Sequence, residues 1–136
     1  MPSFPAVTHV AVTVTDLHNS TSWYATLFGT EAVLDEDEEI GGFHHTVFTI
    51  GDGQLFGLHT HPEPVAGGFD PRRTGLDHVA FACADRNELR TWEARLDELG
   101  IAHEDIVDAH YGSGLAFHDP DGIALEFFAP PAPEQG

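Results

Sequence analysis

Apolar and polar residues alternate along several short segments of the chain, and helical spacing follows two of those segments. Residues 6–14 alternate as in a half-buried strand and lead to Asp16, a residue type that caps helix N-termini. Gly29 supplies the left-handed stop expected at a helix C-terminus. Between them lies an apolar helical stripe of Trp23, Tyr24, Leu27 and Phe28. Three further β-like segments are predicted at residues 31–35, 43–50 and 54–60.

The same order of elements recurs in the second half of the chain. His9-Val10-Ala11-Val12 returns as His78-Val79-Ala80-Phe81, an offset of 69 residues. The offset also carries Asp16 onto Asp85, Trp23 onto Trp92, Leu27 onto Leu96, Phe48 onto Phe117, and Asp52-Gly53 onto Asp121-Gly122. A second helix is predicted from the Asp85–Glu88 capping pattern to Gly100. It is followed by strands predicted at residues 101–107, 114–118 and 123–129.

This repeat predicts the fold class. We expect an α+β fold in which two tandem βαβββ modules form a cupped, barrel-like sheet with the helices outside. Residues 1–136 then form a single domain. Its expected parts are module one at residues 6–60, a Pro- and Gly-rich linker at 61–74, module two at 75–129 and a tail at 130–136.

Charge narrows the classes of partner. Five arginines, no lysine and 23 acidic residues give a formal net charge of −18. Such a field repels phosphate, so we expect no nucleic acid and no membrane surface as a partner. The start of the chain does not resemble a secretory signal, and no apolar run is long enough to span a membrane. With a single Cys83, which fits a reducing compartment, this predicts a cytoplasmic protein.

Three residues form a candidate metal site. Strand alternation places His9 and His78 on the face of equivalent strands that points into the cup, and Glu126 on the same face of the last strand. A carboxylate in so apolar a strand needs a partner, and the chain has few cations. Singly, a strand histidine is typical of packing or surface positions, and Glu126 could be protonated or bonded to a hydroxyl. Their symmetric coincidence favours a metal bound by all three residues.

Other side chains are candidates for contact with a substrate. Gly57 is equivalent to Glu126, so module one offers no side chain at that position. His59 is either a further ligand or an exposed strand end, and one of His44 and His45 must face the cup. We expect a substrate to contact His44, His45, His59, His110 and Phe128. The expected catalytic groups are Glu126 and Tyr111, the latter as an acid–base group unless it is a plain loop residue.

At these residues the chain resembles the vicinal oxygen chelate superfamily, the glyoxalase, bleomycin-resistance and extradiol-dioxygenase-like proteins. The resemblance covers residues 6–129 and rests on Thr8-His9-Val10-Ala11-Val12 with Asp16, Leu76-Asp77-His78-Val79-Ala80-Phe81, and Asp119-Pro120-Asp121-Gly122 leading to Glu126-Phe127. It implies that His9, His78 and Glu126 bind one divalent transition metal (Fe, Mn, Ni, Zn or Co). It also implies a homodimer, with the metal site either within one chain or shared between two. Glyoxalase-type members often have a fourth ligand at the position of Gly57. Without it, the ligand set of two histidines and one glutamate resembles that of extradiol dioxygenases and fosfomycin-modifying transferases.

Two functional hypotheses follow from this resemblance. The first is a metal-dependent enzyme, either a glyoxalase-like lyase or isomerase or an extradiol-type dioxygenase. Because few arginines are placed to reach a ligand, we expect a small neutral or cationic substrate, chelated through its oxygens. The alternative is a non-enzymatic protein that sequesters an antibiotic, as bleomycin-resistance proteins do. The combination of His9, His78 and Glu126 favours the enzyme, because a sequestering protein has no need of these ligands.

Overall fold

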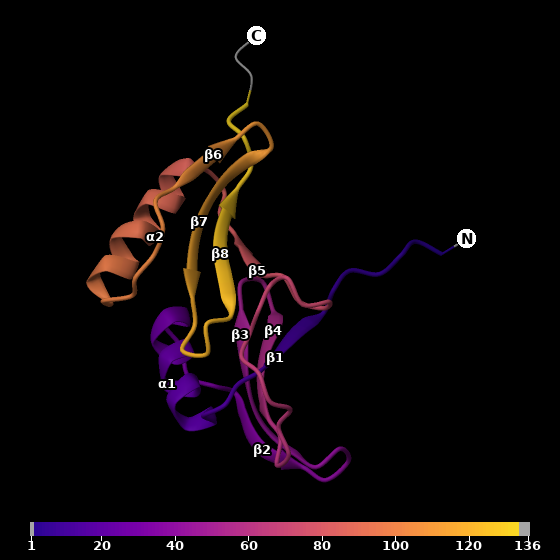
Figure 1. The fold of residues 1–136 in the computed structure, drawn as a ribbon. Helices are drawn as coiled ribbons and strands as arrows, with labels where there is room; N and C mark the ends of the chain where they lie inside the picture. The colour runs from indigo at the N-terminus through magenta and orange to yellow at the C-terminus, as the bar shows by residue number, and fades with distance from the viewer. Residues whose placement is uncertain (1, 134–136) are drawn as a thin grey trace. The chain divides into compact units, whose positions relative to one another are not determined.

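The computed structural model describes residues 2–133, which divide into two compact units between Gly67 and Gly68. Each unit holds one four-stranded sheet and one helix in the order strand, helix, three strands (Figure 1). The predicted α+β class with two tandem βαβββ units is therefore confirmed. The tail expected at residues 130–136 lies partly outside the described residues, which end at residue 133.

The first unit has the strand order β1-β4-β3-β2. β1 runs parallel to β4, whereas the β4–β3 and β3–β2 pairs are antiparallel. Its elements are β1 (His9–Thr13), α1 (Leu17–Phe28), β2 (Leu34–Glu38), β3 (Phe43–Ile50) and β4 (Gln54–Thr60).

The second unit repeats this topology, with the strand order β5-β8-β7-β6 and a parallel β5–β8 pair. The 69-residue sequence offset is thus also a structural repeat, since Ala11 pairs with Gly57 as Ala80 pairs with Glu126. Its elements are β5 (Val79–Ala82), α2 (Arg86–Glu98), β6 (Val107–Ala109), β7 (Gly112–His118) and β8 (Ala124–Ala129).

Both helices begin at the predicted aspartate caps. Asp16 accepts a hydrogen bond from the backbone N–H of Asn19, at 3.0 Å, and Asp85 accepts one from Glu88, at 2.9 Å. Gly29 ends α1 at a φ of 69°, which a residue with a side chain rarely adopts. Within residues 2–133, neither helix combines the length and the apolar character needed to cross a membrane.

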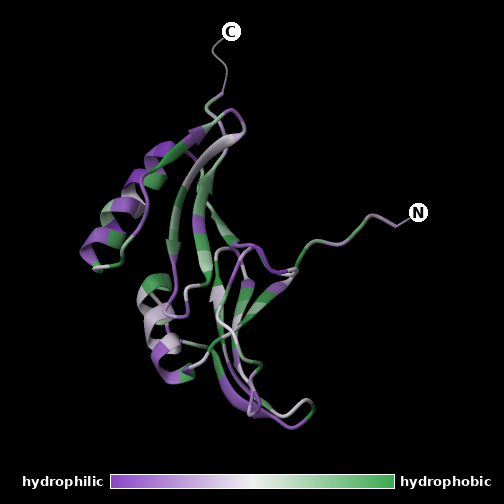
Figure 2. Cartoon of the chain, viewed as in Figure 1, coloured by the Kyte–Doolittle hydropathy of each residue, from purple (hydrophilic) through white to green (hydrophobic). Residues whose placement is uncertain are grey.

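Each sheet packs one face against the helix of its own unit. In the first unit, Tyr24 of α1 lies against Phe56, with ring centroids 5.1 Å apart, and both are fully buried. In the second, Trp92 of α2 stacks on Phe127 at 4.5 Å. Figure 2 shows hydrophobic and hydrophilic residues on opposite sides of α2, as expected for a helix that packs along one stripe. The other face of each sheet is left without a helix and carries most of the candidate site residues.

Two predicted strands differ from the observed ones. The segment predicted at 31–35 becomes β2 at Leu34–Glu38, because pairing with β3 begins only where Val33 donates its N–H to the carbonyl of Val47. The segment predicted at 101–107 forms a strand only at β6 (Val107–Ala109). The backbone N–H of Ile101 still donates a hydrogen bond to the carbonyl of Leu96 in α2. His103 makes only an isolated β-bridge with Phe117.

Candidate functional site

His78 and Glu126 lie side by side on the helix-free face of the second sheet. The β5–β8 register pairs Ala80 with Glu126, and His78 immediately precedes β5. The Nε2 atom of His78 is 3.7 Å from Oε1 of Glu126. Both side chains are partly exposed, at 46% for His78 and 26% for Glu126, so the pair is open to a ligand.

The other ring nitrogen of His78 is held by its neighbour. Nδ1 lies 2.7 Å from Oδ1 of Asp77. When Nδ1 carries the proton and donates a hydrogen bond to Asp77, Nε2 presents its lone pair toward Glu126. A carboxylate behind a histidine in this way is the usual support of a metal ligand, because it fixes both the tautomer and the ring orientation.

His9 has an equivalent support in the first unit. Its Nδ1 lies 2.9 Å from the hydroxyl of Thr8, the residue that the repeat aligns with Asp77. No carboxylate faces His9 from the position of Glu126, because Gly57 stands there. A Cβ at Gly57 would lie 3.6 Å from Nε2 of His59, so the ring of His59 occupies space beside this glycine.

The carboxylate of Glu126 is accommodated by a glycine on the next strand. A Cβ at Gly114 would stand 3.1 Å from Oε2 of Glu126, closer than most side chains tolerate. Among the described residues, His78 is the group within ion-pairing distance of Glu126, and no arginine reaches it. The partly buried carboxylate therefore lacks a permanent cation, which is the condition that a bound metal ion would satisfy.

A cavity of about 340 Å³ lies over the same face of the second sheet and includes Glu126 in its wall. Its floor is opened by small residues on β7, such as Gly114 and Ala116. Phe128 and Tyr111 supply aromatic surface, with nearly parallel rings whose centroids are 6.3 Å apart. The other acidic lining residues are Glu104 and Asp105, and the described lining has no basic residue.

Tyr111 belongs to the turn between β6 and β7. A group of polar contacts that the sequence did not suggest supports β6 and β7 next to this turn. Arg86 donates from Nε to Oδ1 of Asp108 at 2.8 Å, and the hydroxyl of Ser113 donates to the same carboxylate at 2.6 Å. The Arg86 guanidinium, followed by the Ser113 hydroxyl, lowers the pKa of Asp108 to about 2. The sequence gives little sign of the Arg86–Asp108 contact, because the two residues are 22 positions apart and nothing in their spacing relates them.

In the first unit, alternation along β3 decides between the two adjacent histidines. His45 lies on the helix-free face, where it pairs across the ladder with His59, and their rings are 5.3 Å apart. Phe43 stacks on His59 at 4.4 Å. Burial, followed by the nearby His45, His61 and His9, lowers the pKa of His59.

His44 lies on the opposite face, the one shared with Thr46, which contacts Thr21 of α1. Two aspartates of β2, Asp35 and Asp37, bind its two ring nitrogens. The structure thus separates His44 from His45 and His59. His110 is exposed beside Tyr111, with ring centroids 5.2 Å apart.

The sequence of the chain matches a known protein family. The model of the Glyoxalase/Bleomycin resistance protein/Dioxygenase superfamily matches residues 6–127. The chain belongs to this superfamily. The match covers both units and includes His9, His78 and Glu126.

Proteins similar in sequence to this chain include two from Bacillus subtilis. YwkD of Bacillus subtilis (strain 168), an uncharacterized protein, is 25% identical over 125 residues, covering 90% of this chain and 95% of YwkD. A putative ring-cleaving dioxygenase of the same organism, MhqA, is 35% identical over 51 residues, which are 38% of this chain and 16% of MhqA.

Solved structures show the same fold. A glyoxylase/bleomycin resistance protein/dioxygenase domain from Frankia sp. EAN1pec is 29% identical, with a TM-score of 0.83, and the match covers 95% of this chain and all of that one. The fosfomycin resistance protein FosX of Listeria monocytogenes is 18% identical, with a TM-score of 0.67 and 93% of each chain covered. That FosX structure, of a mutant, holds Mn(II) and a dihydroxypropylphosphonic acid.

Proposed function

We propose that this chain is a metal-dependent enzyme of the superfamily that acts on a small neutral or cationic substrate through two of its oxygens. The observation that carries the proposal is the His78–Glu126 pair, with Nε2 of His78 3.7 Å from the carboxylate and Nδ1 engaged by Asp77. His9 is the proposed third ligand, because the repeat makes it equivalent to His78 and Thr8 supports its Nδ1.

The donor set suits the group that the family implies. Two neutral imidazoles and one carboxylate bind divalent transition ions and leave coordination positions free. When bound, such an ion supplies Lewis-acid polarisation of the substrate's oxygens. Fe, Mn, Ni, Zn and Co are all compatible with these ligands, and the Mn(II) held by FosX lends support to this class of ion.

The cavity residues define what the chain itself contributes. Phe128 and Tyr111 offer flat apolar surface to an unsaturated or aromatic part of the substrate. Tyr111 is 66% exposed at the mouth of the cavity, where its hydroxyl can donate a proton to a substrate oxygen or accept one. The acidic lining repels anionic substrates, so phosphonates and glutathione conjugates are disfavoured.

Two reaction branches share these ligands, ring cleavage by an extradiol-type dioxygenase and the proton transfers of a glyoxalase-like lyase or isomerase. The local similarity to MhqA makes ring cleavage the first to test. The protein is loaded with Fe(II) without oxygen and then mixed with oxygen and a series of uncharged catechols. Consumption of oxygen that disappears in Glu126→Gln would support the dioxygenase. Its absence with every catechol would remove that branch and leave the lyase or isomerase.

The role of Tyr111 gives a sharper prediction within the active branch. We expect Tyr111→Phe to lower kcat about tenfold or more while KM changes less than threefold, because the ring remains and only the proton-carrying hydroxyl is lost. Metal content should be unchanged. The control is His18→Gln, which replaces an exposed histidine of α1 in the other unit and leaves the Tyr111 turn intact. Equal kcat in Tyr111→Phe and the parent would contradict the assigned role.

A sequestering protein is the alternative outcome. It predicts tight binding of a cationic ligand that is unaffected by Glu126→Gln, together with no turnover under any metal. Titration of the same two proteins with such ligands therefore separates the alternatives.

A further inference from the structure

β2 and β3 of the first unit carry two histidine–acid clusters on opposite faces of one ladder. β2 holds four consecutive acids, Asp35 to Glu38, and β3 holds His44 and His45. Register pairs Asp37 with His44 and Glu36 with His45. Because strand side chains alternate, the aspartates share a face with His44 and the glutamates share a face with His45.

The His44 cluster is closed to a metal ion. Nδ1 of His44 lies 2.5 Å from Asp37, and Nε2 lies 2.6 Å from Asp35. These two hydrogen bonds, that to Asp37 first, raise the pKa of His44. With both nitrogens donating to carboxylates, His44 has no lone pair for a cation.

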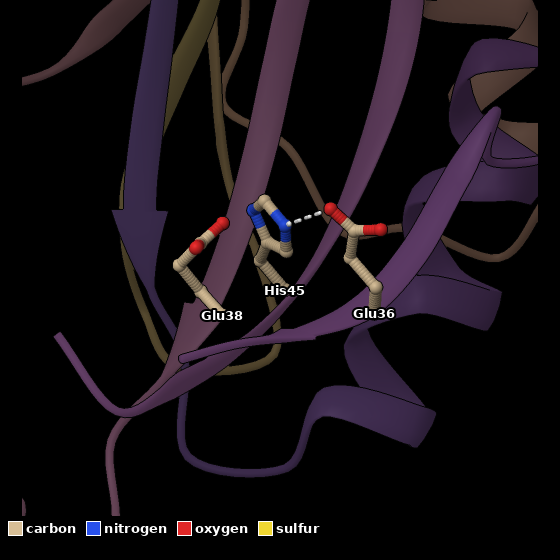
Figure 3. A group of neighbouring side chains, drawn as sticks. All are labelled: Glu36, Glu38 and His45. Carbon is tan, nitrogen blue, oxygen red and sulfur yellow. Dashed lines mark ion pairs between the residues drawn. The ribbon is translucent and has the colours of Figure 1, made fainter. Parts of the chain in front are cut away.

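The His45 cluster is open. Glu36, Glu38 and His45 each present one ligand atom, and these atoms all lie within 4.8 Å of one another. Figure 3 shows the two carboxylates on either side of the His45 imidazole, pointing toward it. Nε2 of His45 is 3.6 Å from Oε1 of Glu36, too far for a hydrogen bond.

The same nitrogen is buried without a partner. Nε2 of His45 has almost no solvent contact and makes no hydrogen bond within residues 2–133. The side chain as a whole is only 13% exposed, and Phe43 packs edge-on against the ring at 5.4 Å. A buried nitrogen that faces the Glu36 carboxylate without a hydrogen bond costs free energy that a cation would recover.

We infer that Glu36, Glu38 and His45 form a second divalent-cation site, which takes a borderline transition ion such as Zn²⁺. One imidazole and two carboxylates suit that class of ion. In a tetrahedral site, bond lengths of about 2.0–2.2 Å place two ligand atoms of one ion about 3.4 Å apart. The three ligand atoms lie within 4.8 Å of one another, so each pair must close by about 1.4 Å at most. Glu36 is half exposed and free to make that movement. The site uses none of the residues proposed to bind the catalytic metal.

A bound ion at this place would join β2, the edge strand of its sheet, to β3. Edge strands are held by one neighbour only, and the four acids of β2 repel one another. The cation would therefore add a link where the sheet has fewest hydrogen bonds. We expect thermal stability of the protein to rise on adding Zn²⁺.

The test compares two triple variants, one on each face of the β2–β3 ladder. One variant is Glu36→Gln/Glu38→Gln/His45→Gln, and the control is Asp35→Asn/Asp37→Asn/His44→Gln, which removes the same charges and one imidazole from the other face. Both are made in untagged Glu126→Gln protein, so that the proposed catalytic site does not contribute. Zn²⁺ binding is measured by calorimetry, after circular dichroism has verified folding.

We expect one Zn²⁺ per chain in the Glu126→Gln parent and in the control, and binding at least tenfold weaker in the Glu36, Glu38 and His45 variant. Equal affinity in the two triple variants would overturn the inference. Because His45→Gln could disturb packing, Glu36→Gln/Glu38→Gln provides a second comparison that keeps the imidazole.

A spectroscopic measurement tests the ligand directly. Small amounts of Mn²⁺ broaden NMR signals most strongly at the imidazole nearest to the ion. In the Glu126→Gln protein the His45 ring signals should broaden at lower Mn²⁺ than those of His44, whose ring lies on the opposite face of the ladder. Broadening of His44 with retention of His45 would contradict the assignment. Failure of the catalytic proposal, in contrast, would appear as unchanged metal binding on mutation of Glu126 in the parent.

Discussion

A single glycine creates the space in which the Glu126 carboxylate lies. Gly114 stands on β7 opposite β8, where an added Cβ would come within 3.1 Å of Oε2. The backbone at Gly114 has no left-handed φ, so alanine is allowed there by conformation and opposed only by this contact. The position thus tests the carboxylate's placement without removing any charge.

We predict that Gly114→Ala weakens metal binding about tenfold while leaving the fold intact, because the displaced carboxylate no longer faces His78 in the same geometry. Titration with Mn²⁺ or Zn²⁺ gives the affinity, and thermal melting gives the stability. Gly68→Ala is the control, since nothing lies within 4 Å of its added Cβ. A Gly114→Ala protein that binds metal as tightly as this control would argue against Glu126 as a ligand.

At this scale the sequence revealed some residues and not others. His9, His78 and Glu126 could be chosen because the repeat puts them at related positions, and the structure places His78 beside Glu126. Alternation could not say which of His44 and His45 faces away from α1, since the register of β3 was open. The supports from Asp77 and Thr8 depend on side-chain rotamers, which no pattern of residue types encodes.

At the scale of elements, the β2–β3 ladder differs most from what its sequence suggests. Four acids in a row are typical of a solvated loop, yet β2 is a strand in which Asp35 and Asp37 are paired with His44 of β3. Helix caps and the long strands β3 and β4 were predictable, because Asp16, Gly29 and the apolar alternation are local signals. β2 was misplaced because its pairing is decided by β3.

The His44 contacts predict a pH dependence of stability. The folded state raises the pKa of His44 above its ordinary value of 6.5, so it holds the proton more tightly than the unfolded chain. This stabilisation is fully present below about pH 6.5 and is lost as the pH rises through the higher folded pKa. We therefore expect His44→Gln to lower the free energy of unfolding more at about pH 5.5 than at about pH 9.

Urea unfolding at the two pH values measures this difference. His18→Gln, which replaces an exposed histidine on α1, is the control variant. A loss for His44→Gln that is constant with pH, or larger at the alkaline end, would show that the Asp35 and Asp37 contacts do not set its charge.

At the scale of the whole molecule, the two units show how a repeat diverges. Positions that hold histidines in the first unit, His45 and His59, hold Gly114 and Phe128 in the second. The second sheet thereby gains a cavity with aromatic walls, whereas the first gains a group of imidazoles. Only the second unit has an acid at the position of Glu126, so the two sheets carry different chemistry on one topology.

The resemblance to a family of dimers predicts the assembly. We expect the protein to be a homodimer in solution, with twice the 14.8 kDa mass of the chain. Light scattering on protein eluting from a sizing column measures this mass without a shape assumption. The strong net negative charge of −18 requires moderate salt in the buffer, because repulsion at low ionic strength would favour separate chains. A mass of one chain in such a buffer would contradict the expectation.

The proposed function depends on the binding of a transition metal by Glu126 and His78. The most direct measurement is metal content by mass spectrometry, on untagged protein purified without chelators and compared with Glu126→Gln and His78→Ala. Glu104→Gln, which alters another acid of the same cavity, is the control. We predict that each ligand variant contains about one equivalent less of Fe, Mn, Ni, Zn or Co per chain than the parent and the control. Equal metal content in all four proteins, or a parent that takes up none of these ions when they are supplied, would contradict the claim.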